Sequence, residues 1–249
     1  MAAVTGNLET VRGELAPGGT LRAGINLGNI LLVTGSTPAG DPAGVSPDMA
    51  RAIAERLGVE VTYVPFASPG EVADAVGDDR WDIALIADDP ERAETIAFAA
   101  AYVEIEATYL VPPGSPLQSI GDVDRPGVRI AVSGRSAYDL YLARSLRQAE
   151  LHRGKGLKGA FELFVGEGLE ALAGLRPALI ENAAALPGAR VLEGCYTSVR
   201  QAIGAKPGNA ASVAFLKAFV AEARESGLVA RLIERHGVAG RLQVAAEGG

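Results

Sequence analysis

The chain has 249 residues, 48% of them hydrophobic, and its 30 acidic against 23 basic side chains give a formal net charge of −7. A chain of this length can bury a full core, as one large domain or as two smaller ones. An acidic chain without a basic stripe repels phosphate backbones and anionic lipid surfaces, so we expect no nucleic-acid partner and no membrane insertion, and we favour a small-molecule ligand.

The chemistry-bearing residues are few. The single cysteine, Cys195, can form no internal disulfide, and His152 and His236 are not in metal-ligand spacing. We therefore expect no metal, no cofactor and no Ser-His or Cys-His catalytic arrangement. The start of the chain has no basic segment followed by an apolar run, as a signal peptide would have, so the localisation stays open: periplasmic if the sequence is a mature form, cytoplasmic if Met1 is the native start.

The first predicted elements alternate between strand and helix. Residues 20–25 (TLRAGI) predict a strand, and a loop rich in Gly, Pro and Thr follows. In residues 46–58, Met49, Ile53 and Leu57 share one helical face, Gly58 ends the helix, and Ser46 or Asp48 caps it. Residues 59–66 alternate as a strand does, residues 68–77 predict a short helix, and residues 81–87 a further strand. This βαβαβ order indicates a mainly parallel sheet.

A second series of elements repeats this plan. Residues 127–132 predict a strand, residues 137–150 an amphipathic helix, and residues 161–165 (FELFV) and 169–175 (LEALAGL) two short strands. Residues 197–209 predict a strand and a turn, and two helices follow in residues 210–227 and 228–237.

The predicted fold is therefore α/β with two lobes, built of mainly parallel sheets with helices on both faces and a ligand cleft between the lobes. We expect an N-terminal extension over residues 1–18, a first lobe over residues 19–110 and 197–249, and a second lobe over residues 111–196. A Rossmann dinucleotide site is excluded because Gly24 and Gly28 do not match G-x-G-x-x-G, and a long loop separates them from the first helix.

The chain resembles the solute-binding proteins of the type II periplasmic-binding fold, in particular the amino-acid-type receptors of ABC transporters (substrate-binding family 3). The resemblance rests on GTLRAGINLGN, GVSPDMARAIAERLGVEVTYVPF and WDIALIADDPERAETIAFAAAYVEIEATYLV in the first lobe. It continues in SIGDVDRPGVRIAVSGRSAYDLYL and SGLVARLIERHG, and covers residues 19 to 238 through the order and spacing of these segments.

The resemblance implies that Arg92, in the Glu-Arg pair after the third strand, binds the carboxylate of the ligand. A guanidinium suits this role because its planar fork of donors fits a carboxylate. The alternative is that Arg92 pairs with a neighbouring acid, Asp88, Asp89 or Glu91. The resemblance also implies ligand contact for Asn26 and Asn29 in the first loop, although both residues also suit plain turns.

In the second lobe, SGRSA is the matching segment. The backbone N–H groups of Ser136 and Ala137 at a helix N-terminus suit an anion, and Arg135 adds a cation. The alternative is that Ser133 or Ser136 is an ordinary N-cap.

The sequence departs from the family pattern where an acidic residue for the ligand's ammonium is expected, because Leu175 and Arg176 stand there. This favours an organic anion without an α-amino group, unless Glu104, Glu106 or Asp88 supplies the charge. Of these acids we select Asp88 and Glu106 as ligand-binding candidates.

We therefore expect a monomeric, non-enzymatic binding protein that captures a small organic anion or amino-acid-like ligand, with an ABC-type permease as a possible partner. The lobes would hinge near residues 107–113 and 194–202. The alternative is a dehydratase on the same fold, acting on a small carboxylic acid with Glu104, Glu106 or Glu170 as general acid. The sensor module of a signalling assembly is a third possibility.

Overall fold

The computed structural model describes residues 8–246. The described residues form two compact units, the first comprising residues 8–104 and 200–246 and the second residues 105–199. It passes from one unit to the other inside β6 (Ala97–Val111) and returns inside β11 (Thr197–Ala205). These passages lie close to the predicted lobe boundaries, but they assign residues 105–110 and 197–199 to the second unit rather than the first.

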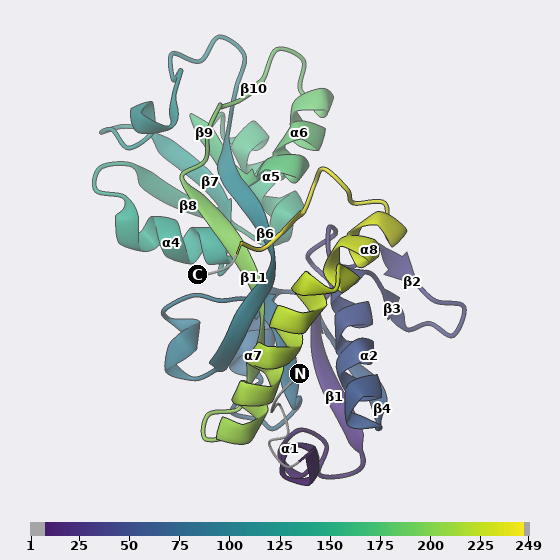
Figure 1. Ribbon diagram of the computed structural model, residues 1–249. Coiled ribbons are helices and arrows are strands. Elements are labelled where there is room, and N and C mark those ends of the chain that lie inside the picture. The colour runs from purple at the N-terminus through teal and green to yellow at the C-terminus, as the bar shows by residue number, and fades with distance from the viewer. Residues whose placement is uncertain (1–7, 247–249) are drawn as a thin grey trace. The chain divides into compact units, whose positions relative to one another are not determined.

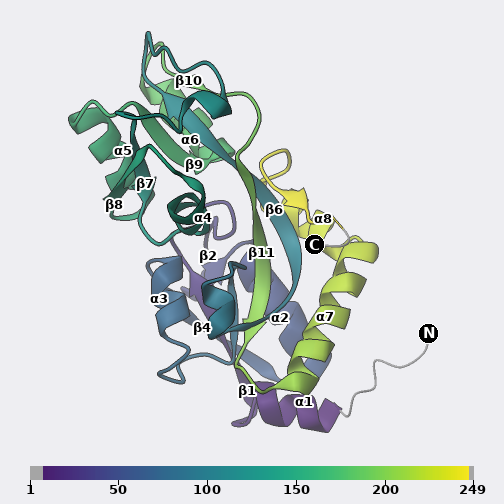
Figure 2. The same ribbon diagram turned by 90° about the vertical axis from the view of Figure 1, so that its left-hand side faces the viewer.

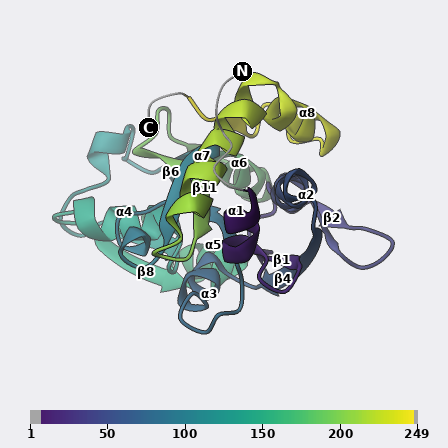
Figure 3. The ribbon, with the colours of Figure 1, turned by 60° about the horizontal axis from the view of Figure 1, so that its bottom comes forward.

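The first unit is built on three parallel strands, β4 (Glu60–Phe66), β1 (Thr20–Asn26) and β5 (Ile83–Ala87), which lie in that order. The strand β11 adds antiparallel to β5. Two helices, α2 (Val45–Leu57) and α3 (Pro69–Asp74), pack on these strands, and Figure 3 shows β1 and β4 between them. All of β5 is buried because it is covered on both faces, as a parallel strand usually is.

The helix α2 buries Met49, Ile53 and Leu57 and ends at Gly58 in the left-handed conformation, as predicted. The predicted cap is wrong. The helix begins at Val45 after Gly44, and no side chain caps it. The Ser46 hydroxyl instead bonds the Tyr102 hydroxyl at 2.8 Å, and Asp48 bonds His236 Nε2 at 2.8 Å. Contacts distant in sequence therefore use both predicted capping groups.

The C-terminal helices α7 (Ala210–Glu225) and α8 (Leu228–Arg235) belong to the first unit, and α8 contacts α2. The helix α1 (Leu8–Leu15) buries Val11 and Leu15 and packs at one end of α7 (Figure 2). The described part of the predicted N-terminal extension is thus part of this unit's fold, and its residues 1–7 lie outside the described residues. The short strands β2 (Gly35–Ser36) and β3 (Pro42–Ala43) pair with each other, and β12 (Gln243–Val244) pairs with β6.

The second unit has three parallel strands in the order β9 (Ala171–Leu175), β7 (Arg129–Ser133) and β8 (Glu150–Gly154). On the other side of β9, β6 pairs with it antiparallel, and the short β10 (Arg190–Val191) pairs antiparallel with β6. The helices are α4 (Ala137–Ser145), α5 (Gly156–Gly166) and α6 (Arg176–Ala185), and Figure 1 shows β7 and β8 between α4 and the other two. The predicted α/β class, with mainly parallel strands and helices on both faces, is confirmed.

Two predicted elements of this unit are wrong. Residues 161–165, predicted as a strand, lie inside α5, where Ala160 and Phe164 occupy one buried face four residues apart. The helix predicted over residues 137–150 ends at Ser145, and the strand β8 follows it. Both segments are too short for periodicity to separate strand from helix, so tertiary packing decides them.

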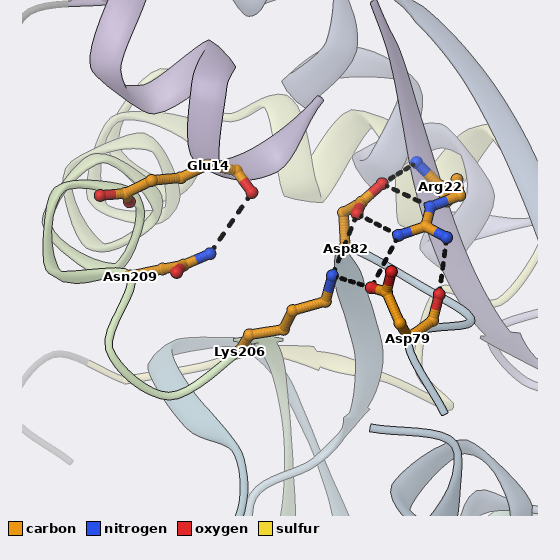
Figure 4. A network of polar contacts seen from close by, with 6 residues as sticks. All are labelled: Glu14, Arg22, Asp79, Asp82, Lys206 and Asn209. Carbon is orange, nitrogen blue, oxygen red and sulfur yellow. Dashed lines mark hydrogen bonds and ion pairs between the residues drawn. The ribbon is translucent and has the colours of Figure 1, made fainter. Parts of the chain in front are cut away.

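In both units, an arginine near the amino end of one parallel strand binds an acidic residue that precedes the neighbouring strand. We call this arginine-acid pair the clamp. In the first unit, Arg22 of β1 donates to Asp82, which precedes β5, through its backbone N (2.9 Å), Nε (3.0 Å) and Nη2 (2.7 Å), as Figure 4 shows in part. In the second unit, Arg129 of β7 donates to Glu170, which precedes β9, through the same three nitrogens (2.8, 2.9 and 2.9 Å).

The backbone hydrogen bonds of the two clamps also match. The N–H of Asp82 donates to the Arg22 carbonyl at 2.8 Å, and the N–H of Glu170 donates to the Arg129 carbonyl at 3.1 Å. The two units thus share a local construction without sharing a sequence. In each, the arginine fixes the register between a strand and its parallel neighbour.

Candidate functional site

The loops that could bind a ligand in the first unit follow the carboxyl ends of its parallel strands. The strand β1 ends at Asn26 and β5 at Ala87, and the register aligns Ile25 with Leu85. Parallel strands bring their carboxyl ends to one edge of a sheet, and ligands of α/β proteins usually bind outside this edge. The segments 26–30 and 88–92 therefore start from the same edge.

The asparagines of the first loop shape its backbone. The Asn26 Oδ1 accepts from Gly28 N at 3.0 Å, and the Asn29 Oδ1 accepts from Leu31 N at 3.2 Å. Both are thus turn residues, as the alternative interpretation expected. The loop also exposes two large apolar side chains, Leu27 (42%) and Ile30 (47%), which the sequence analysis did not single out.

The predicted carboxylate-binding arginine lies in the turn after β5. Arg92 begins the short 3-10 helix η1 (Arg92–Glu94), and it is only 5% exposed. Its Nη1 donates to the Ala87 carbonyl at 2.8 Å, which anchors the guanidinium to the end of β5. The neighbouring Asp89 is buried as well, and its Oδ1 accepts from Glu91 N at 2.9 Å, which closes the turn that carries Arg92.

Asp88 is placed against β11. Its backbone N–H donates to the Arg200 carbonyl at 3.0 Å, and its carboxylate lies 3.6 Å from Arg200 Nε. Burial raises the pKa of the Asp88 carboxyl above its ordinary value. Arg200 is a neighbour that the sequence analysis missed, because it comes from a strand more than a hundred residues further along the chain.

The second unit offers the turn after β7. Ser136 is the N-cap of α4, with its Oγ accepting from Asp139 N at 3.1 Å, and its own N–H donates to the Ser133 carbonyl at 3.3 Å. Arg135 is exposed, has a φ of 60°, and donates its backbone N–H to Asp139 Oδ2 at 2.7 Å. Ala137 is the first residue of the helix, and its first-turn N–H has no acceptor within a helix.

The acidic candidates in the second unit are engaged in ion pairs. Glu106 accepts from Arg176 Nε at 2.6 Å, and Arg176 also donates to the Leu192 carbonyl at 3.3 Å. Glu170 is the partner of Arg129 in the clamp, and the hydrogen bonds from Arg129 hold the pKa of its carboxyl below the ordinary value. This lowered pKa disfavours Glu170 as a general acid, which must hold a proton. Glu104, in the first unit, stands opposite Gln243 in the β6–β12 register.

An aromatic cluster in the second unit was not predicted. The ring of Tyr196 lies 4.5 Å from that of Tyr109 and 5.9 Å from that of Tyr141. The Tyr196 hydroxyl is buried and has no hydrogen-bond partner among the described residues, and burial raises its pKa well above the ordinary value. The three tyrosines come from separate elements, so no local pattern indicates the cluster.

Two kinds of site are absent from residues 8–246. No group of three or more His, Cys, Asp or Glu side chains is placed to hold a metal ion there. No helix in that range is long and apolar enough to cross a membrane.

The fold, with parallel strands in each unit and loops at their carboxyl ends, is that of the two-lobed binding proteins. Residues 33–239 match the bacterial extracellular solute-binding proteins, family 3. The chain belongs to this family, which confirms the resemblance drawn from the sequence.

Solved structures agree on the fold. An ancestral amino acid-binding protein described as a precursor of cyclohexadienyl dehydratase has a TM-score of 0.72 at 22% identity, over 92% of this chain and 98% of that one. A putative ABC-transporter binding component from Wolinella succinogenes, complexed with lysine, has a TM-score of 0.72 at 21% identity, over 87% and 95%. A histidine kinase sensor domain has a TM-score of 0.74 at 19% identity, over 91% and 98%.

One curated relative is an enzyme. The cyclohexadienyl dehydratase of Pseudomonas aeruginosa is 30% identical over 119 residues, which are 46% of this chain and 44% of the enzyme. The matched segment thus spans less than half of the enzyme's length.

Proposed function

We propose that this protein is a receptor that captures a small carboxylate-bearing molecule, an organic anion or an amino-acid-like compound, and delivers it to an ABC-type permease. This proposal rests chiefly on the burial and anchoring of the Arg92 side chain. Its guanidinium is almost fully buried and is anchored at the carboxyl edge of the first unit by the bond to Ala87. A fixed, partly desolvated guanidinium binds a carboxylate more strongly than a mobile one because less side-chain entropy is lost.

The other contacts would come from both carboxyl edges. In the first unit, Asn26 and Asn29 shape the loop that presents the exposed Leu27 and Ile30, which suit an apolar part of the ligand. In the second unit, the N–H of Ala137 at the N-terminus of α4, with the cation of Arg135, suits a second anionic group, whereas the Ser136 N–H already donates to the Ser133 carbonyl.

Capture requires the two units to move, and the proposed hinges are the segments near residues 107–113 and 194–202. The chain passes between the units at residues 104–105 and 199–200, inside or close to these segments. The proposed place of action is outside the cytoplasmic membrane, in keeping with the family's description, and none of the comparisons supports the cytoplasmic alternative.

Dehydration of a small carboxylic acid remains the second candidate because of the match to the dehydratase. Its general acid would have to hold a proton near neutral pH, which a raised pKa permits. Asp88 meets this requirement in direction, since burial raises the pKa of its carboxyl, whereas Glu170 does not.

A thermal-shift screen tests the proposal, with amino acids, keto acids, aromatic acids and dicarboxylates as ligands and NMR to detect chemical change. A ligand at 100 times its Kd should stabilise the protein by about 2.7 kcal/mol. For each compound found, Arg92→Gln should weaken binding at least tenfold in calorimetry, because a charged hydrogen-bond donor is lost.

The matched control is Arg231→Gln. Arg231 is an exposed arginine of the same unit that donates to the Ser226 carbonyl at 2.9 Å, and its replacement should leave affinity unchanged. Binding that is unaffected by Arg92→Gln would contradict the assignment of Arg92. Consumption of a compound by the wild type would establish the dehydratase instead.

A further inference from the structure

A segment near the end of the chain runs along β6 in the first unit. We call residues 242–246 the strap. Within it, β12 pairs antiparallel with β6, so that Gln243 lies opposite Glu104 and Val244 opposite Val103. The match to the family ends before the strap begins, so the strap is an addition to the part of the chain that defines the family.

The strap is held to β6 by contacts beyond this pairing. The Ala245 N–H donates to the Tyr102 carbonyl at 3.1 Å, and Ala245 is buried in one hydrophobic cluster with Ala101. From α7, Arg224 Nη1 donates to the Ala101 carbonyl and to the Ala246 carbonyl, both at 3.2 Å. Arg224 therefore ties β6 and the strap to the same helix of the first unit.

The pairing of the strap with β6 ends where the first unit ends. Glu104 is the last residue of that unit before the chain passes to the second, in which β9 pairs with β6 from Ala107 onwards. Ile105 and Glu106 lie between these two partners. The neighbour of β6 on its path through the sheet, β11, itself passes between the units, whereas the strap belongs wholly to the first.

We propose that the strap limits the hinge of this protein: it holds β6 to the first unit as far as Glu104 and so confines the bending of this strand to Ile105 and Glu106. When two domains move, a few residues absorb the change of φ and ψ. A strand segment that loses its hydrogen-bond partners opens more readily. Without the strap, the bending would extend back to Ala101, and the two units would sample a wider range of separations.

The role of the strap rests on the proposed function in one respect, the movement of the two units that capture requires. It goes beyond that function because no ligand-binding residue takes part in it, and its test needs no ligand. A short hinge also leaves less conformational freedom to be lost when a ligand closes the units, so the strap should strengthen binding.

Hydrogen exchange of the ligand-free full chain tests whether the strap holds β6. Two variants weaken it: Arg224→Gln removes the donor to both carbonyls, and Ala245→Pro removes the N–H that binds the Tyr102 carbonyl. We expect exchange over residues 101–105 to become about tenfold faster in each variant, since a hydrogen bond is lost, and exchange in β1 and β5 to stay unchanged. The matched control is Arg231→Gln, an exposed arginine of the same unit.

Pulsed electron paramagnetic resonance tests the effect on the hinge. The spin labels are placed on two exposed positions, Glu55→Cys in the first unit and Lys158→Cys in the second. The background is Cys195→Ser, because the native cysteine is exposed and would take a label. We expect both strap variants to show a broader distribution of distances between the labels than the parent and Arg231→Gln do.

Two results would overturn the proposal. One is faster exchange spread evenly over the first unit, because the strap would then only stabilise that unit. The other is an unchanged distribution of distances in both strap variants. If one of the two variants fails to fold, the other decides. The proposed function fails separately, when Arg92→Gln leaves the affinity for every compound of the screen unchanged.

Discussion

The substitution Asp82→Asn tests how much the clamp between Arg22 and Asp82 contributes to the stability of the first unit. The Asp82 side chain is completely buried and accepts three hydrogen bonds from Arg22, and Lys206 Nζ lies 3.5 Å from it. Asparagine keeps the shape, but removes the charge and replaces one acceptor by a donor. The Arg22 guanidinium then loses its buried counter-charge and keeps only Asp79.

The expected loss follows from this burial. Breaking a buried ion pair by removing one partner costs about 3 to 5 kcal/mol. Arg22 is 34% exposed and retains Asp79, so water and the second acid compensate in part, and we expect about 3 kcal/mol. This is a large share of the roughly 5 to 15 kcal/mol that stabilises a typical domain.

Urea unfolding followed by tryptophan fluorescence measures this loss. The only tryptophan, Trp81, is the residue before Asp82, is fully buried and donates to the Val72 carbonyl at 2.9 Å, so its emission reports on the first unit. Glu170→Gln is the matched control, because Glu170 makes the same bonds to Arg129 but is 36% exposed. Since Glu170 lies in the second unit, the unfolding of this variant is followed by far-ultraviolet circular dichroism, which reports on both units. This substitution should cost far less, since solvent screens an exposed pair. A loss below about 1 kcal/mol for Asp82→Asn, or an equal loss for both variants, would refute the argument from burial.

We expect three further substitutions to change the stability of the protein. Gly44→Ala should destabilise the first unit by at least about 2 kcal/mol, measured by urea unfolding, because φ is 155° and a Cβ would lie 2.1 Å from the Leu32 carbonyl oxygen. The pKa of the Glu170 carboxyl is lowered in the folded protein, so its ionised form stabilises the fold above the ordinary pKa near 4.5. This stabilisation is lost as the pH falls through the folded-state pKa. The variant Glu170→Gln should therefore show a smaller fall of the melting temperature in acid. The pKa of the Asp88 carboxyl is raised in the folded protein, so its ionised form destabilises the fold. The variant Asp88→Asn should therefore have a higher melting temperature at neutral pH, and this difference should vanish in acid below the ordinary pKa of aspartate.

The sequence predicted those elements whose signals are local. The helix α2 follows from Met49, Ile53 and Leu57 on one face and from Gly58 at its end, and β5 follows from a short apolar run. The strand β8 (Glu150–Gly154) has the sequence ELHRG, which carries no apolar alternation, and pairs only with β7 at the side of its sheet. Its conformation is decided by that pairing, so no local pattern could indicate it.

The candidate site was predicted less completely, because its polar contacts connect distant residues. Asn29 and Ser136 were expected either to bind a ligand or to serve as a turn and a cap, and the structure shows these local bonds for both. The pairs of Asp88 with Arg200 and of Glu106 with Arg176 span 112 and 70 residues. Such neighbours become visible only when the strands are placed in order.

The repeated clamp fixes the parallel strands at the ends that lie away from the candidate ligand-binding loops. In each unit the arginine and its acid fix two parallel strands at their amino ends, at Arg22 with Asp82 and at Arg129 with Glu170. The loops at the carboxyl ends take no part in these bonds, so their residues can change without loss of the register. In the proposed function, the groups that fix the strands and the groups that bind the ligand therefore lie at opposite ends of the same strands. We therefore expect Arg92→Gln to weaken ligand binding while the fold persists, and a substitution in the clamp to lower stability instead.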